Sequence, residues 1–200
     1  MEITIPCEKI ARLSNILKFF PDYADEWSDS FRLEDQYVMM TNRCFMVVER
    51  VPGMSVSPAV HITADETLIE QCRNETQFSS NLHLIINHIL GIATIRTTMG
   101  YTHPGNLLMR HNTPNKLDEW KSVIPMTPLD ASRGGLALDL KQVKMLIEAS
   151  PSKVIVFEEN INANVPTIVR DKIDPDWFGV FRPDDDGSPH EPATLPGWFK

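Results

Sequence analysis

The strongest candidates for binding chemistry are basic side chains in two segments whose apolar residues repeat with the period of a helix. Lys9, Arg12 and Lys18 flank an apolar stripe near the N-terminus, and Lys141 and Lys144 lie beside a similar stripe further along the chain. Such cations can be ordinary solvated charges of an amphipathic helix, or they can contact nucleic-acid phosphates without reading the bases. Both interpretations stay open until the surrounding elements are considered.

Aromatic side chains next to basic ones form a second group of candidates. Tyr37 lies near Arg43, and Tyr101 lies near Arg96. Aromatic rings beside cations can stack on the bases of single-stranded DNA while the cations neutralise its phosphates. The alternative is that these rings belong to the hydrophobic core.

Catalytic and cofactor motifs are missing from the sequence. It contains no G-x-x-x-x-G-K-[ST] or G-x-G-x-x-G loop for nucleotide phosphates, and His83 and His88 do not have the H-E-x-x-H spacing of a zinc site. Asp171, Asp174 and Asp176 fall in a single loop, whereas a two-metal nuclease needs carboxylates from different elements. The sequence predicts a protein that is not an enzyme and that uses no cofactor and no metal.

The composition is that of an acidic, soluble protein. The 200 residues carry a formal net charge of −8, so DNA could be held only through a local basic surface. No apolar run reaches the roughly eighteen residues of a membrane span, and the start of the chain does not resemble a signal peptide. These features predict a cytoplasmic protein with no membrane contact, in the host cytoplasm if the chain is viral. Cys7, Cys44 and Cys72 are widely spaced, which is typical of reduced structural thiols.

Residues 136–183 predict a strand, a helix and three further strands. The helix is expected to begin at Asp139, which has capping-box spacing to Gln142, and to end before Pro151. Turns rich in Asn, Asp and Pro separate the expected strands, which are 153–158, 165–170 and 177–182.

The N-terminal half repeats this order twice. In the first repeat, an alternating run at Ile3 and Ile5 precedes a helix, and three strands are expected at 30–33, 37–41 and 43–51. In the second repeat, a strand at 59–62 leads into a helix started by a Thr63-x-x-Glu66 capping box. Two strands are expected from residue 82 onward and a third at 106–110. Glu66 and Glu70 make the outer face of that helix acidic.

The C-terminal unit resembles the last unit of a sliding clamp, the ring-forming processivity factor of DNA polymerases. The resemblance lies in the closing strand Phe178-Gly179-Val180-Phe181-Arg182-Pro183 and in the segment 117–125, which is similar to the linker between clamp domains. It implies an α+β fold of repeated β-α-β-β-β units, with antiparallel sheets and helices on one face. It also implies that a cleft near Val180 and Phe181 receives partner peptides.

Three units are an odd number for this fold, because two units make one clamp domain. The expected organisation is a clamp-like domain of two units at 1–112, a linker at 113–135, a third unit at 136–183 and a tail at 184–200. A bacterial clamp subunit has twice as many units, so a closed ring would need more copies or another partner. The sequence therefore predicts a homo-oligomer.

Residues 184–200 predict a disordered acidic tail whose tip carries Trp198 and Phe199. The tail resembles those of single-stranded DNA-binding proteins, which recruit other replication proteins, although the terminal Lys200 departs from that pattern. The alternative is a solubilising tail whose aromatic residues pack on the domain.

Two functional hypotheses follow. The first is a non-enzymatic replication accessory protein of the sliding-clamp kind, with the basic residues of the first and last helices facing duplex DNA. The second is a single-stranded DNA-binding protein, such as a viral replication or transcription cofactor, with Arg43, Arg96 and Tyr101 beside the bases. Both imply replication or transcription proteins as partners.

Overall fold

The structure, a computed structural model, describes residues 1–19, 30–41, 45–87, 92–102, 140–157 and 166–181. Its helical elements are α1 (Cys7–Leu13), η1 (Ser14–Phe19), α2 (Glu66–Glu75), η3 (Thr76–Phe78) and α4 (Leu140–Ala149). Its strands are β1 (Glu2–Pro6), β2 (Ser30–Asp35), β3 (Tyr37–Thr41), β4 (Phe45–Arg50), β5 (Val56–Thr63), β6 (Asn81–Asn87), β7 (Ile92–Thr97), β8 (Ile155–Phe157), β9 (Thr167–Asp171) and β10 (Trp177–Phe181).

These elements follow the predicted order and group into three units. Unit one consists of β1, α1, β2, β3 and β4; unit two of β5, α2, β6 and β7; and unit three of α4, β8, β9 and β10. The strands expected at 106–110 and 136–138 lie outside the described residues, as do the predicted linker and tail.

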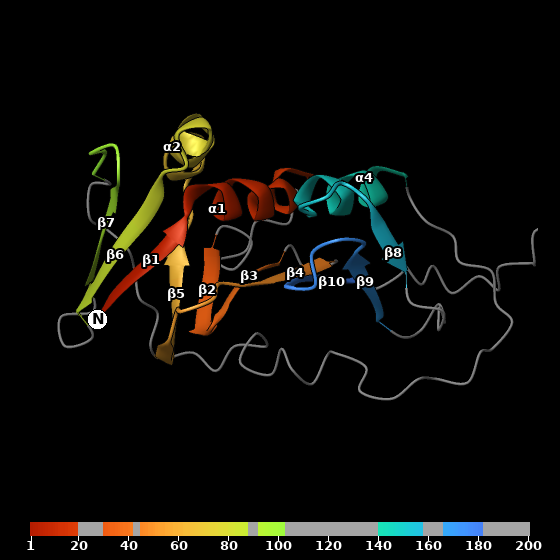
Figure 1. The fold of residues 1–200 in the computed structure, drawn as a ribbon, viewed down its shortest axis with the longest axis horizontal. Helices are drawn as coiled ribbons and strands as arrows, with labels where there is room; N and C mark the ends of the chain where they lie inside the picture. The colour runs from red at the N-terminus through yellow and green to blue at the C-terminus, as the bar shows by residue number, and fades with distance from the viewer. Residues whose placement is uncertain (20–29, 42–44, 88–91, 103–139, 158–165, 182–200) are drawn as a thin grey trace, which may run out of the picture.

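All the described strand pairs are antiparallel, and they join the units in a reciprocal way. One sheet has the order β1-β6-β7 and the other the order β5-β2-β3-β4-β10-β9-β8. Unit one thus gives its first strand to unit two, with Ile3 opposite Leu84, and unit two gives its first strand to unit one, with Leu33 opposite Val60. Figure 1 shows α2, α1 and α4 following one another along one side of the molecule, with the strands on the other side. The predicted α+β class, with antiparallel sheets and helices on one face, is confirmed.

Two of the expected element boundaries are wrong, each for a local reason. Thr63 does not cap α2, because it is still the last residue of β5 and pairs with Ser30. Asp65 is the N-cap instead, and its side chain accepts a hydrogen bond from the Leu68 N–H at 2.8 Å. The strand expected from residue 153 begins at Ile155, because Lys153 has a left-handed backbone with φ of 61° that a strand cannot contain.

The core lies between the helices and the sheets. Ile10 and Leu13 of α1 belong to the same core cluster as Phe31 and Leu33 of β2, and all four side chains are fully buried. Cys7 and Cys72 are free thiols buried in the same core, and α1 packs against α2. At the seam between units one and three, Phe45 of β4 stacks on Phe181 of β10 with ring centroids 5.3 Å apart. Units one and three therefore share one continuous sheet and one core.

Candidate nucleic-acid interface

Helix α4 presents three stripes of side chains with different properties. The stripe that is buried against the core consists of Gln142, Met145, Leu146 and Ala149. The stripe that carries charge consists of Lys141, Lys144 and Glu148. The stripe that is apolar and at least partly exposed consists of Leu140, Val143 and Ile147. Because residues three or four apart share a helix face, the charged and apolar stripes flank the buried one on separate sides.

The charged stripe of α4 keeps its lysines accessible. The Lys144 ammonium lies 3.8 Å from a Glu148 carboxylate oxygen, and the two side chains are 69% and 41% exposed. An exposed pair of this kind contributes only about 0–1 kcal/mol, since water screens both charges. Lys141 is exposed as well. A phosphate could therefore approach the Lys144 ammonium at little cost.

Lys153 adds a cation at the C-terminal end of α4, and the sequence analysis missed it. Its Nζ donates a hydrogen bond to the main-chain oxygen of Glu148 at 2.6 Å. Desolvation and the nearby charge of Arg12 hold the pKa of Lys153 below its ordinary value. A basic residue shortly after a helix end often bonds the last carbonyl groups, and that rule is a signal that could have identified it.

The basic residues of α1 are used inside the molecule, which corrects the expectation that they face DNA. Glu49 of β4 is fully buried and accepts hydrogen bonds from Lys9 and Arg12. Arg12 Nη2 lies 2.6 Å from both carboxylate oxygens of Glu49, and Arg12 Nη1 lies 2.7 Å from Glu8. Arg12 is itself buried. Because these charges are neutralised beneath α1, they are unavailable to a phosphate.

The structure describes only some of the other basic and tail residues that the sequence singled out. Lys18 belongs to η1, which packs against α4. Arg43, Trp198 and Phe199 lie outside the described residues. Their expected roles stay predictions.

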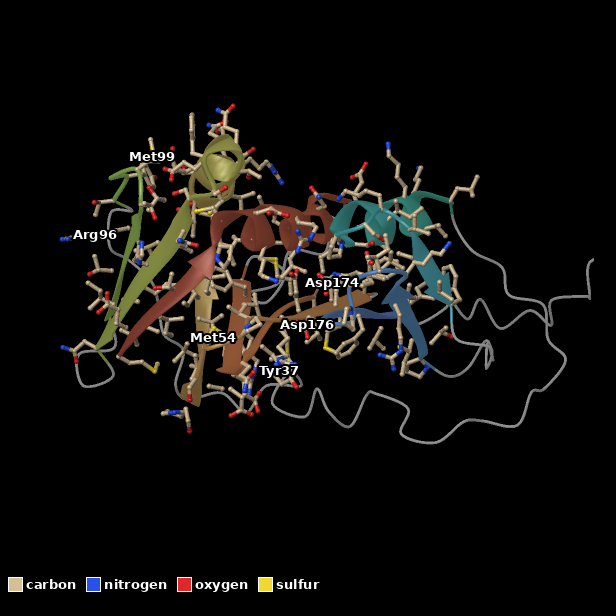
Figure 2. All side chains as sticks on the ribbon, in the orientation of Figure 1. Tyr37, Met54, Arg96, Met99, Asp174 and Asp176 are labelled. Atoms are coloured by element: carbon tan, nitrogen blue, oxygen red, sulfur yellow. The ribbon has the colours of Figure 1, made fainter. Side chains whose placement is uncertain are left out.

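Arg96 and Tyr101 lie close together in sequence at the β7 end of the molecule, but they face opposite ways. Arg96 is exposed and pairs across the ladder with Thr102, so these two side chains share a face. Tyr101 directly precedes Thr102, and alternation along an extended chain directs its ring to the other face. The Thr97 N–H donates to the main-chain oxygen of Tyr101 at 2.9 Å, and the Tyr101 N–H donates to the Thr97 hydroxyl oxygen at 3.2 Å. The two side chains are not arranged as a joint stacking platform. Figure 2 shows Arg96 at the opposite end of the molecule from α4.

Val180 and Phe181, expected at a partner-binding cleft, are both buried. Phe181 belongs to the main core. Val180 belongs to a second apolar cluster with Met39, Met46 and Val48, against which Tyr37 is packed. Because neighbouring residues of a strand point to opposite faces, both faces of β10 are apolar. These two side chains stabilise the sheet and do not offer an open surface; Tyr37 is likewise part of an apolar cluster.

The helical side of the molecule is not uniformly basic. Glu66 and Glu70 of α2 are exposed, as expected, and Glu8 of α1 is 65% exposed. Lys141 and Lys144 occupy the other end of the same side. A polyanion would therefore be repelled over α2 and attracted over α4.

Asp171 fixes the loop that follows α4. Its carboxylate accepts hydrogen bonds from Ser150 Oγ and from the N–H groups of Ser152, Ile173 and Asp174, the last three at 2.7–2.8 Å. Burial alone would raise the pKa of Asp171, but these bonds hold it well below its ordinary value. Asp171 therefore ties the C-terminal end of α4 to the β9–β10 turn.

The described residues do not gather possible metal ligands in one place. Among them, no group of three or more His, Cys, Asp or Glu side chains could hold a metal ion. Asp171 is occupied by its own loops, and Asp176 pairs with Arg50 at 3.3 Å. Within the same residues, no helix combines the length and apolarity that crossing a membrane requires.

Comparison with solved structures adds the fold-level context. No protein-family model matches the sequence, and no curated protein matches it. A DNA polymerase sliding clamp from Pseudomonas aeruginosa superposes with a TM-score of 0.64 at 10% identity, over 92% of this chain and 66% of that one. A DNA polymerase III beta subunit from Eubacterium rectale gives 0.62 at 8% identity, over 94% and 66%. The beta sliding clamp of C. crescentus gives 0.58 at 12% identity, over 91% and 65%.

The chain spans about two thirds of the length of those clamp subunits. Its fold is that of the sliding clamps.

Proposed function

We propose that this chain is a clamp-like accessory protein that holds replication proteins on duplex DNA by binding and not by catalysis. The observation that supports the proposal is the charged stripe of α4, whose Lys144 is exposed, on a helix that lies on the same side of the molecule as α1 and α2 (Figure 1). Lysines on a rigid helix attract phosphates without reading bases, and a contact of that kind lets a protein move along DNA. The sliding-clamp fold supports this function.

The proposed DNA contact is concentrated at the unit-three end of the helical side. Lys141 and Lys144 are exposed there, and Lys153 lies at the end of the same helix. The α1 cations are bound to Glu49, and α2 carries exposed carboxylates. We therefore expect unit three to supply most of the attraction for phosphate.

The test compares retention on circular and linear duplex DNA at several salt concentrations. A clamp that encloses DNA stays on a closed circle and leaves through the ends of a linear molecule. Lys144→Glu should weaken retention, whereas Arg96→Glu, the same charge change at the far end of the molecule, should leave it nearly unchanged. Equal losses for the two variants, or equal retention on the two DNA forms, would contradict the proposal.

The single-strand alternative is tested by measuring binding to matched single-stranded and duplex oligonucleotides. It requires preferential binding to single-stranded oligonucleotides and loss of that binding in Arg96→Glu and in Tyr101→Ala. The opposed directions of Arg96 and Tyr101 do not favour it. Partner recruitment by Trp198 and Phe199 is a separate part of the proposal, and Trp198→Ala should then lower binding of a replication or transcription protein without changing DNA retention.

A further inference from the structure

Two cysteines from different units meet inside the molecule. Cys7 is the first residue of α1 in unit one, and Cys72 lies in α2 of unit two; both are free thiols and both are fully buried. The Cys72 thiol donates a hydrogen bond to the sulfur of Cys7. The two sulfur atoms are therefore neighbours, although the strands from β2 to β5 lie between the two helices in the chain.

Hydrogen bonds of the surrounding chain hold this meeting point in place. The Cys7 N–H donates to the main-chain oxygen of Ser80 at 2.9 Å. Thr76 Oγ1 donates to the main-chain oxygen of Cys72 at 2.9 Å, and Glu75, the last residue of α2, accepts a hydrogen bond from Ser80 Oγ. Helix α1 packs against both α2 and the η3 turn that follows it. The start of α1 is thus bonded to the same short segment that carries Cys72.

The two thiols differ in acidity. The hydrogen bond from Cys72 lowers the pKa of Cys7, and it outweighs the opposing effect of burial. The same bond raises the pKa of Cys72, and burial raises that pKa further. Because the thiolate and not the thiol is the nucleophile, Cys7 is the sulfur that reacts first and Cys72 is the one that keeps its proton.

We propose that Cys7 and Cys72 are an oxidation site, at which a hydroperoxide joins units one and two through a disulfide. The Cys7 thiolate attacks a peroxide oxygen, the O–O bond breaks, and the departing oxygen takes up a proton and leaves as water or an alcohol; Cys7 becomes a sulfenic acid. The Cys72 sulfur then bonds to the Cys7 sulfur, and the hydroxide that leaves Cys7 takes the Cys72 proton to form water. The two thiols lose two electrons in all, and the peroxide gains them.

Burial limits the rate of this reaction, and the position of the two sulfurs sets its consequence. Because both sulfurs are fully buried, a peroxide reaches them only when the contact between α1 and α2 opens locally, so oxidation is slower than at an exposed thiol. Once formed, the bond ties α1 to α2 and restricts the unfolded chain between them. The site is independent of the proposed DNA contact, because the charged stripe of α4 belongs to unit three.

The test treats the folded full chain with hydrogen peroxide, unfolds it in iodoacetamide to block the remaining thiols, and maps its digest by mass spectrometry without a reducing agent. The expected product is a peptide that contains Cys7 joined to one that contains Cys72. The matched control is Cys44→Ser, which removes the third cysteine of the sequence and should leave this cross-link unchanged. The intact mass of that variant should fall by about 2 Da on oxidation, because two hydrogen atoms are lost. Circular dichroism verifies that each protein is folded before treatment.

Single-site variants separate the roles of the two sulfurs. Cys72→Ser should leave Cys7 as a sulfenic acid that dimedone labels, whereas Cys7→Ser should leave Cys72 as an unreacted thiol. If a serine variant does not fold, the map of the wild type still decides, and its urea midpoint should rise on oxidation and return to the reduced value with dithiothreitol. Alkylation of both Cys7 and Cys72 after treatment, a cross-link to Cys44 in place of theirs, or a cross-link that forms only in urea would each overturn the proposal.

Discussion

Helices α1 and α4 have similar sequence patterns, yet their basic residues have different ion-pair partners. Both helices follow the start of a unit, and both carry two cations beside an apolar stripe. Those of α1, Lys9 and Arg12, are held by the buried carboxylate of Glu49. Lys144 of α4 meets only the exposed Glu148, at 3.8 Å.

The difference comes from the third hairpin strand of each unit. Glu49 in β4 is a buried carboxylate, whereas β10 contains no acidic residue. A carboxylate below α1 requires cations to offset its desolvation, and β10 makes no such demand. Lys9 and Arg12 are therefore held by the sheet, whereas Lys144 keeps an exposed ammonium group.

The largest expected effect is the loss of the buried acid. Glu49→Gln leaves Lys9 and Arg12 without their shared partner, and it should lower the free energy of unfolding by about 3–5 kcal/mol in urea titrations. The matched control is Glu8→Gln, because Glu8 bonds the same Arg12 from an exposed position and should cost about 1 kcal/mol or less. Similar losses for the two variants would show that burial does not separate the two contacts.

The second-largest loss of stability is expected at Asp171, which anchors the C-terminal end of α4. Asp171→Asn removes the charge that four hydrogen-bond donors stabilise, and it should cost about 2–3 kcal/mol at neutral pH. Because the folded-state pKa of Asp171 is depressed, this stabilisation is complete above the unfolded-state pKa of about 3.9 and is lost as the pH falls toward the folded-state pKa.

Unfolding of wild type and Asp171→Asn measured from pH 6 down to about 2 should show the two free energies converging below about pH 4. A difference that stays constant over this range would mean that the carboxylate charge contributes nothing.

A smaller effect should separate the two helices in DNA binding. Lys144→Gln should reduce the slope of log affinity against log salt by about one, since one phosphate contact is lost. Lys9→Gln should leave that slope unchanged and lower the stability of the fold instead, because Lys9 forms an ion pair with the buried Glu49. The reverse pattern would place the DNA contact on α1.

The smallest effect on DNA binding is expected at the exposed ion pair of α4, between Lys144 and Glu148. Glu148→Gln removes the carboxylate beside Lys144, and it should strengthen DNA binding by about 0.3–0.5 kcal/mol at low salt and by less at high salt. Binding isotherms of the wild type and the variant at two salt concentrations measure it. Weaker binding in the variant would show that Glu148 positions Lys144 productively.

Much of the fold could be predicted from local patterns of apolar and polar residues in the sequence. The apolar period of the helices and the alternation around Ile3 and Ile5 predicted the element types, and the resemblance of residues 117–125 and 178–183 to sliding clamps implied the fold. The errors were local: Asp65 caps α2 in place of Thr63, because the β5–β2 pairing extends the strand through Thr63. The direction of Tyr101 relative to Arg96 also depended on a pairing, with Thr102, that residue spacing did not reveal.

Local patterns in the chain indicated where most helices and strands lie, because period and capping act between near neighbours. Which cations are held inside the molecule could be learned only from the packed fold. Arg12 and Glu49 are 37 positions apart in the chain and meet because β4 passes beneath α1, whereas β10 carries no carboxylate. Desolvation at such a contact outweighs any local preference of the charged side chain, and it exists only once distant segments have packed together.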